Sequence, residues 1–298
     1  MLKIEHLSKR FGDKVALDDI SFVAEPNKIL GLIGQNGAGK TTTFHSILNF
    51  ISYDGKISWK NKEINEDCFD QIGYLPEERS LMQKLTLQEQ IVYYAQLKGM
   101  KKQDVLNKID AWLDRFEVNG NKSDKIKTLS KGNQQKVQLI CTLIHQPKLI
   151  ILDEPFSGLD PINAELLKTA ILDAKNNGAI IIFSSHDMAN VEEICDSLLM
   201  LRKGQVVLKG PVEEVRNSFS KNEILVKTVT PLAQLIKLPH VQTVEPRKNN
   251  RYLLRIDDEK NGPAVFAALT QGQYIEEYQQ QAPTLDEIFR MKASEENA

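Results

Sequence analysis

A glycine-rich stretch near the N-terminus has the residue types needed to hold phosphate groups. Residues 34–41 read Gly-Gln-Asn-Gly-Ala-Gly-Lys-Thr and match the pattern G-x-x-x-x-G-K-[ST]. The glycines let backbone N–H groups approach phosphate oxygens, Lys40 can neutralise their charge, and the Thr41 hydroxyl can bind Mg²⁺. We therefore expect nucleotide contacts from Gly34, Asn36, Gly37, Ala38, Gly39, Lys40, Thr41 and Thr42. A glycine turn before an ordinary helix is the alternative, but chance produces this pattern in only about 0.01 of chains of this length.

Two adjacent carboxylates follow an apolar run in the middle of the chain. Residues 149–154 read Leu-Ile-Ile-Leu-Asp-Glu, which predicts a buried strand that ends in Asp153 and Glu154. In sheets of this type such a strand ends beside the phosphate loop, so Asp153 would hold Mg²⁺ through a water. Glu154 would orient or deprotonate the water that attacks ATP. Alone, the pair fits a solvated acidic turn equally well, but together with the loop it predicts a hydrolysis site.

The elements around these residues predict an α/β fold. The apolar run Ile29–Ile33 precedes the loop and a helix is expected over Thr42–Ile51, which is the strand–loop–helix order of a phosphate loop. Apolar residues at helical spacing, without a strand pattern, predict a helical subdomain over about residues 80–145. Strand patterns return at Ile180–Ser184 and in a hairpin around Lys203-Gly204.

Size, composition and charge exclude several classes of function. The chain has 298 residues, of which 41% are hydrophobic and 26% charged, and its formal net charge is -2. This composition is ordinary for a globular protein and lacks the basic excess of a nucleic-acid binder, so no nucleic-acid partner is expected. No apolar run approaches the roughly 20 residues of a transmembrane helix, so the chain is not expected to insert into a membrane. The 3 widely spaced cysteines suggest neither disulfides nor a metal site.

A second, smaller domain is expected at the C-terminus. Small polar residues at 218–222 mark a boundary, which gives domains of residues 1–220 and 221–298. The strand and helix patterns of the second domain follow the order β-α-β-β-α-β, which predicts an α+β, ferredoxin-like fold. Two roles are open for this domain: a dimerisation or stabilising appendage, or a ligand-sensing regulatory module.

Further motifs resemble those of the ABC ATPases over about residues 1–220. Residues 129–135, Leu-Ser-Lys-Gly-Asn-Gln-Gln, resemble the family's signature motif and precede the strand that ends in Asp153. Asp160 ends a D-loop-like Ser-Gly-Leu-Asp, His186 matches the switch histidine, and Phe11 has the position of the aromatic that stacks on adenine. The resemblance implies a P-loop ABC-ATPase core with a helical subdomain and an antiparallel β subdomain.

The resemblance also implies a mechanism that needs two chains. In this family two ATPase domains close head to tail over two ATP molecules, and hydrolysis reopens them to drive a separate membrane permease. The catalytic group would be Lys40, Glu154 and His186. The residues expected to contact ATP held by a second ATP-binding subunit, either an identical copy or a close paralogue, are Ser130, Gly132, Asn133 and Asp160.

Two positions depart from the usual motifs. Lys131 stands where the signature commonly has glycine, and Asn133 where it commonly has glutamine. Lys131 is either a solvent-facing lysine of little effect or an added positive charge near the partner's phosphate. Glu77 aligns with the usual Q-loop glutamine, so we expect it to contact Mg²⁺ and to couple the site to the membrane partner. Arg79, two residues on, would offset its charge.

One branch of the family is resembled more closely. Residues 76–79, Pro-Glu-Glu-Arg, and the ending at 282–289 resemble ATP-binding subunits paired with ABC-2-type export permeases, including sodium-efflux systems. The resemblance implies an exporter motor at the cytoplasmic face of the cell membrane, bound peripherally to an ABC-2-type permease. The alternative is a soluble ABC ATPase that acts in translation or on nucleic acid. The single cassette and the short stretch between Lys40 and Ser130 disfavour that alternative.

Overall fold

The computed structural model describes residues 1–78 and 80–294, which form two compact units that divide between Lys209 and Gly210. The sequence placed the boundary later, near residues 218–222. The polar residues there follow a short helix, α7 (Val212–Asn217), which belongs to the second unit. Val212 and Val215 of this helix are buried, so the composition changes only after the new unit has begun.

The first unit is built around a six-stranded sheet with the strand order β10-β9-β3-β8-β7-β6. The strands are β3 (Lys28–Ile33), β6 (Ile72–Leu75), β7 (Leu149–Leu152), β8 (Ile180–Ser185), β9 (Ser197–Arg202) and β10 (Gln205–Pro211). β3 pairs in parallel with β8 and β9, and β7 pairs in parallel with β6 and β8. Every residue of β7 and β8 is buried, as expected for apolar strands covered on both faces. The predicted α/β fold is confirmed.

A second, antiparallel sheet in this unit has the order β2-β1-β4-β5. Its strands are β1 (Leu2–Phe11), β2 (Lys14–Ala24), β4 (Asp54–Trp59) and β5 (Lys62–Glu63). Alternate residues of β1, such as Leu2 and Ile4, are buried in a core shared with the central sheet and with Phe44 of α1. This sheet therefore helps to fix α1 (Lys40–Ile47), the helix that follows the glycine-rich loop.

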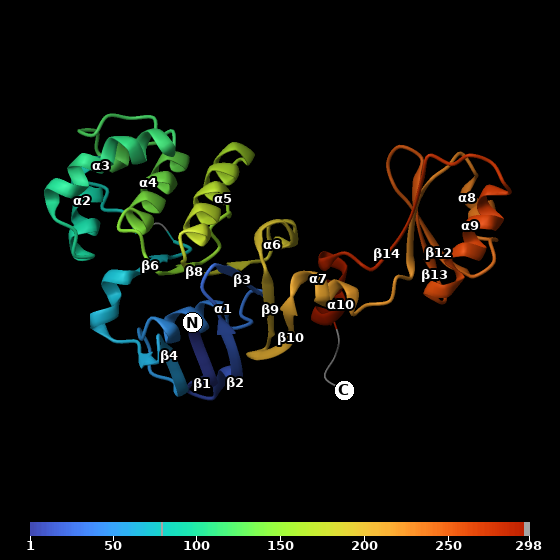
Figure 1. The fold of residues 1–298 in the computed structure, drawn as a ribbon, viewed down its shortest axis with the longest axis horizontal. Helices are drawn as coiled ribbons and strands as arrows, with labels where there is room; N and C mark the ends of the chain where they lie inside the picture. The colour runs from blue at the N-terminus through green and yellow to red at the C-terminus, as the bar shows by residue number, and fades with distance from the viewer. Residues whose placement is uncertain (79, 295–298) are drawn as a thin grey trace. The chain divides into compact units, whose positions relative to one another are not determined.

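Helices complete the first unit. They are α2 (Leu87–Leu97), α3 (Lys102–Arg115), α4 (Lys131–Leu143), α5 (Pro161–Asn176) and α6 (Met188–Ile194). The first three pack on one another and form the helical subdomain expected over residues 80–145 (Figure 1). α1 ends at Ile47, four residues earlier than expected, because Asn49 adopts a left-handed backbone with φ +56. Among the described residues, no helix is long and apolar enough to cross a membrane.

The second unit has the predicted order β-α-β-β-α-β. Its elements after α7 are β11 (Glu223–Lys227), α8 (Leu232–Leu235), β12 (Val241–Pro246), β13 (Arg251–Ile256), α9 (Gly262–Thr270), β14 (Glu277–Gln281) and α10 (Leu285–Ser294). The strands form an antiparallel sheet in the order β12-β13-β11-β14. This is the split βαβ arrangement, and α8 and α9 lie together on one side of the sheet (Figure 1). β14 begins at Glu277, after a turn in which Gln271 and Gly272 adopt positive φ.

The core of the second unit is separate from that of the first. It contains Ile224, Val226, Leu254, Ile256 and Val265, all buried. Leu254→Ala should therefore cost about 2–5 kcal/mol of unfolding free energy. Differential scanning calorimetry of the full chain should show only the second unit's transition moving to lower temperature.

Val229→Ala is the matched control, because Val229 is 91% exposed and its truncation should change stability by no more than about 0.5 kcal/mol. An equal shift of the whole heat-absorption profile in Leu254→Ala would show that the two cores unfold as one.

Candidate functional site

The glycine-rich loop connects β3 to α1 in a backbone path that only glycine follows without strain. Gly34 has φ +157, and a Cβ there would lie 2.5 Å from the Leu201 carbonyl oxygen. Gly39 has φ +112, and a Cβ there would lie 2.8 Å from the Ala16 oxygen. Both distances are shorter than a carbon–oxygen contact permits, so the loop conformation depends on these glycines.

Lys40, the first residue of α1, is directed into the loop. Its side chain is only 7% exposed, and its Nζ donates to the Gly34 oxygen at 2.7 Å. The same Nζ lies 3.5 Å from Oε1 of Glu154. A buried ammonium at the start of a helix places positive charge where the helix N-terminus also favours an anion.

Asp153 is held by two hydroxyl groups at the end of β7. The carboxylate is buried, its Oδ2 accepts from Thr41 Oγ1 at 2.8 Å, and its Oδ1 accepts from Ser184 Oγ at 2.6 Å. The sequence did not predict a role for Ser184. The parallel register of β7 and β8, which sets Leu152 opposite Phe183, brings Ser184 level with Asp153.

Glu154 joins the catalytic residues expected from the sequence. Its side chain is 9% exposed, Oε2 lies 2.9 Å from Nδ1 of His186, and Oε1 faces Lys40. Its backbone has φ +48, a left-handed conformation that is uncommon for glutamate, and its N–H donates to Ser184 Oγ at 2.8 Å. Strained backbone of this kind is characteristic of functional sites, and here it turns the carboxylate toward Lys40 and His186.

Lys40, Thr41, Asp153 and Glu154 border a cavity of about 400 Å³. The expected loop residues that line it are Asn36, Gly37, Gly39, Lys40, Thr41 and Thr42. Gly34 and Ala38 are buried within the same loop. Phe11 and Glu77, which are far from the loop in sequence, lie in the cavity wall, and the Phe11 ring is 51% exposed. Phosphate-binding groups and an exposed aromatic ring therefore share one cavity, as a nucleotide would require.

The donor set at this cavity fits Mg²⁺. The Thr41 hydroxyl and the Asp153 carboxylate are in contact, and the Glu77 carboxylate lines the same cavity. These are the hard oxygen ligands that Mg²⁺ prefers, and this ion usually takes only one or two carboxylates together with phosphate and water. Arg79 lies outside the described residues.

The partly buried phenol of Tyr74 lies near these carboxylates. Burial, together with the charges of Asp153 and Glu77, raises the pKa of Tyr74 to about 12. Tyr74 is therefore a neutral hydrogen-bonding group at physiological pH.

The signature-like residues lie at the N-terminus of α4 and do not line the cavity. Ser130 caps the helix, with its Oγ accepting from the Asn133 N–H at 3.2 Å. The Asn133 amide is used within the chain: Oδ1 accepts from Asn119 N at 3.1 Å, and Nδ2 donates to Asn119 O at 3.2 Å. Lys131 is exposed in the first helical turn.

Asp160 lies at the N-terminus of the neighbouring helix, α5. Its two carboxylate oxygens accept from Asn163, from N–H at 2.9 Å and from Nδ2 at 2.6 Å. A Cβ on Gly132 would lie 3.5 Å from the same Asn163 Nδ2. Asn163, which the sequence did not single out, therefore bonds to the D-loop-like aspartate and lies close to the signature-like glycine.

Comparisons with known proteins match both units. A family model described as ABC transporter matches residues 17–157, and one described as ATP-binding protein DrrA1-3-like, C-terminal domain, matches residues 210–293. The chain is 42% identical to the uncharacterized ABC transporter ATP-binding protein YhaQ of Bacillus subtilis, over 97% of both chains. It is 31% identical to the lipopolysaccharide export system ATP-binding protein LptB of Haemophilus influenzae, over 73% of this chain and 93% of LptB.

A solved structure of an ATP-binding subunit of an ABC transporter is also similar. It aligns with a TM-score of 0.69 and 32% sequence identity, and the alignment covers 73% of this chain and 92% of that one.

Ser184 offers a direct test of how the carboxylates are positioned. Ser184→Ala removes the donor to Asp153 and the acceptor for the Glu154 N–H, so kcat for ATP hydrolysis should fall about 10–100-fold. Nucleotide affinity should change little, because Lys40 and the loop remain intact. Steady-state hydrolysis and equilibrium titration with ATP measure the two effects.

Ser185→Ala is the matched control, since Ser185 is also buried but its hydroxyl bonds to Asp187. Equal losses of kcat in the two variants would contradict a specific role for Ser184.

Proposed function

The chain belongs to the ABC transporter ATP-binding proteins, and we propose that it hydrolyses ATP by closing head to tail on a second copy of itself. Its family identity makes it the ATP-hydrolysing motor subunit of a transporter. The observation that supports the mechanism is that Lys40 and Glu154 meet beside the Thr41–Asp153 contact in the wall of one nucleotide-sized cavity, with His186 in contact with Glu154. A close paralogue in place of the second copy would supply the same groups.

Each residue of this cluster has a distinct task in hydrolysis. The loop N–H groups and Lys40 bind the phosphates, and the Phe11 ring stacks on the adenine. Glu154, directed by its left-handed backbone, orients the attacking water and accepts its proton. His186, which is 64% exposed and contacts Glu154 at 2.9 Å, keeps that carboxylate in place. Mg²⁺, when held by Thr41, Asp153 and Glu77, would neutralise charge on the phosphates.

The second copy supplies the groups that the cavity lacks. Ser130 and Gly132 lie at the N-terminus of α4, outside the cavity wall, where free N–H groups and the helix dipole favour an anion. In a head-to-tail dimer they would face the γ-phosphate bound by the other copy's Lys40. Asn133 would support this contact indirectly, because its amide already holds the Asn119 backbone.

This arrangement makes ATP a contact between the two copies. ATP binds the closed dimer better than the open one because only the closed dimer surrounds the γ-phosphate with two sets of donors. Hydrolysis removes that preference, so the dimer reopens. The difference in affinity between the two states is the source of mechanical work.

We further propose that the work drives an ABC-2-type membrane permease in export. The described residues contain no helix able to cross a membrane, so a pore would come from a separate chain. The match of residues 210–293 to the DrrA1-3-like C-terminal domain and the similarity to LptB, named for an export system, support this assignment. The subunit would then lie at the cytoplasmic face of the membrane, with Glu77 coupling the site to the permease.

Glu154→Gln tests the general base and the dimer together. The amide cannot accept the proton, so kcat should fall at least about 100-fold while ATP binding persists. Size-exclusion chromatography with ATP should then show a stable dimer. Adding Ser130→Phe to Glu154→Gln should abolish that dimer without weakening ATP binding to the single chain. Wild-type turnover in Glu154→Gln would overturn the assignment of the base.

The membrane partner can be identified by affinity capture. The tagged full chain should recover a polytopic membrane protein from detergent-solubilised membranes, and mass spectrometry should identify it as a permease. Glu77→Ala should retain the basal ATPase rate more fully than the stimulation of that rate by the captured permease. Recovery of ribosomal or nucleic-acid-bound proteins without a membrane protein would contradict the proposed partner.

A further inference from the structure

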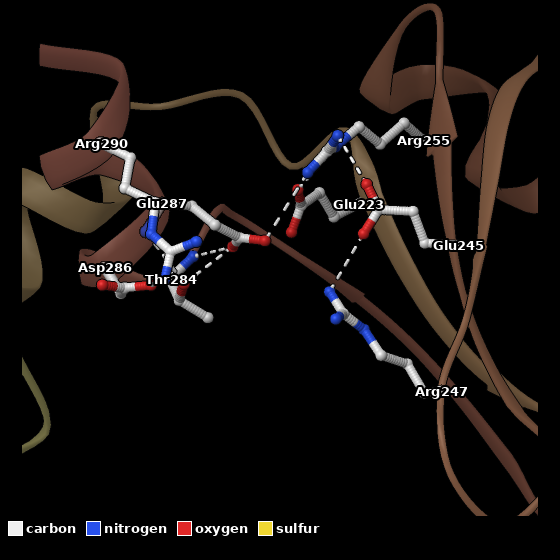
Figure 2. Close-up of polar contacts among 8 residues, drawn as sticks. All are labelled: Glu223, Glu245, Arg247, Arg255, Thr284, Asp286, Glu287 and Arg290. Carbon is white, nitrogen blue, oxygen red and sulfur yellow. Dashed lines mark hydrogen bonds and ion pairs between the residues drawn. The ribbon is translucent and has the colours of Figure 1, made fainter. Parts of the chain in front are cut away.

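The second unit contains a cavity of about 720 Å³ that is not part of the nucleotide site. It lies where the ends of β11, β12 and β13 meet the segment leading into α10. A cluster of charged side chains surrounds it (Figure 2). The cluster contains the carboxylates of Glu223, Glu245, Asp286 and Glu287 and the guanidinium groups of Arg247, Arg255 and Arg290.

Arg255 occupies the centre of the cluster. Its Nε donates to Glu223 Oε1 at 3.1 Å, its Nη1 lies 3.0 Å from Glu245 Oε1, and its Nη2 lies 3.7 Å from Glu287 Oε1. Arg247 pairs with the other oxygen of Glu245 at 3.2 Å. One guanidinium thus serves three carboxylates (Figure 2).

The other ion pair of the cluster adds no positive charge for these three carboxylates. Arg290 pairs with Asp286 at 2.7 Å within α10. Among the described residues, Glu223, Glu245 and Glu287 thus share the two guanidinium groups of Arg247 and Arg255, one positive charge short.

The Glu223 carboxylate has a buried oxygen to which an additional hydrogen-bond donor could bind. Its side chain is 5% exposed, and its Oε2 is buried without a hydrogen-bond partner among the described residues. Burial, and then the neighbouring Glu287 charge, raises the pKa of Glu223. A buried acceptor without a hydrogen bond reduces the stability of the fold, so a ligand that donates a hydrogen bond to this oxygen would be stabilising.

The Glu287 carboxylate, in the same cluster, has a second oxygen with few contacts. Its Oε2 accepts from the Thr284 N–H at 2.8 Å and from the Thr284 hydroxyl at 2.7 Å. Burial opposes ionisation of Glu287, but these hydrogen bonds outweigh it and lower its pKa. Its Oε1 lies 3.7 Å from Arg255 Nη2, and the Glu287 carboxyl is also close enough to Glu223 for the two groups to share a proton.

We propose that this cavity binds a small organic cation, a primary alkylammonium, whose N–H groups donate to Glu223 Oε2 and Glu287 Oε1. The ammonium supplies both the missing charge and the missing donors. A bare metal ion fits less well, because Arg255 already lies between the carboxylates and the described residues contain no metal-holding group of acidic, His or Cys side chains. The cavity wall also includes Phe219, Pro283 and Met291, which suit the hydrocarbon part of the ligand.

Calorimetric titration of the full chain, without nucleotide, tests this site independently of ATP hydrolysis. The probe is n-pentylammonium chloride. Tetramethylammonium chloride carries the charge without N–H groups, and 1-pentanol carries the chain without charge. Saturable binding is expected for n-pentylammonium, with much weaker or no binding of the other two.

Glu223→Gln should weaken binding of n-pentylammonium at least about tenfold, the loss expected for one charge-assisted hydrogen bond. Glu277→Gln is the matched control, because Glu277 pairs with Arg251 and does not line the cavity, and it should bind like the wild type. Circular dichroism and thermal melting confirm that both variants fold. Binding should also weaken as pH falls from 8 to 5, since a proton shared by Glu223 and Glu287 competes with the ammonium.

Absence of saturable binding to the wild type would overturn the proposal, with a shared proton then filling the site. Equal affinity of Glu223→Gln and the wild type, or equal binding of tetramethylammonium, would overturn it as well.

Discussion

The parallel pairing of β7 with β8 is the constraint on which the candidate site depends. Its register brings the ends of the two strands level, so that Asp153 and Ser184 meet at one edge of the sheet. The Ser184 hydroxyl donates to Asp153 and also accepts from the N–H of Glu154. One buried hydroxyl thereby fixes the Asp153 carboxylate and the Glu154 backbone. The left-handed backbone of Glu154, with φ +48, is the local strain that this arrangement maintains.

The two features proposed to bind phosphate lie in different places on the chain. The glycine-rich loop and Lys40 face the cavity, whereas Ser130 and Gly132 lie outside its wall at the start of α4. Hydrogen bonds within the chain stabilise each feature separately. Asn133 holds the loop after α3, and Asn163 donates to Asp160 close to the start of α4. Both features are built before any second chain arrives, so association would cost little reorganisation.

The sequence predicted the parts of the site whose chemistry is local. The glycine spacing before Lys40 and the apolar strand before Asp153 are short local patterns that each predict a chemical role from a few residues. The structure brings the two segments together at one cavity. Ser184, Asn163 and the pairing of Asn133 with Asn119 could not be predicted, because each depends on strand register or helix packing between distant segments. For the same reason the charged cavity of the second unit emerged only from the structure, whereas the early end of α1 follows from the left-handed backbone of Asn49.

Mixing two inactive variants tests most directly whether two half-sites must meet across two chains. Lys40→Ala removes the loop half, and Ser130→Phe blocks the signature half. Neither variant should hydrolyse ATP alone, but a mixture should regain activity, because each mixed dimer keeps one intact pair of half-sites. Restored ATPase activity that rises with the fraction of mixed dimers is the predicted result. Wild-type turnover by Ser130→Phe alone, or a mixture no more active than its components, would contradict a shared site.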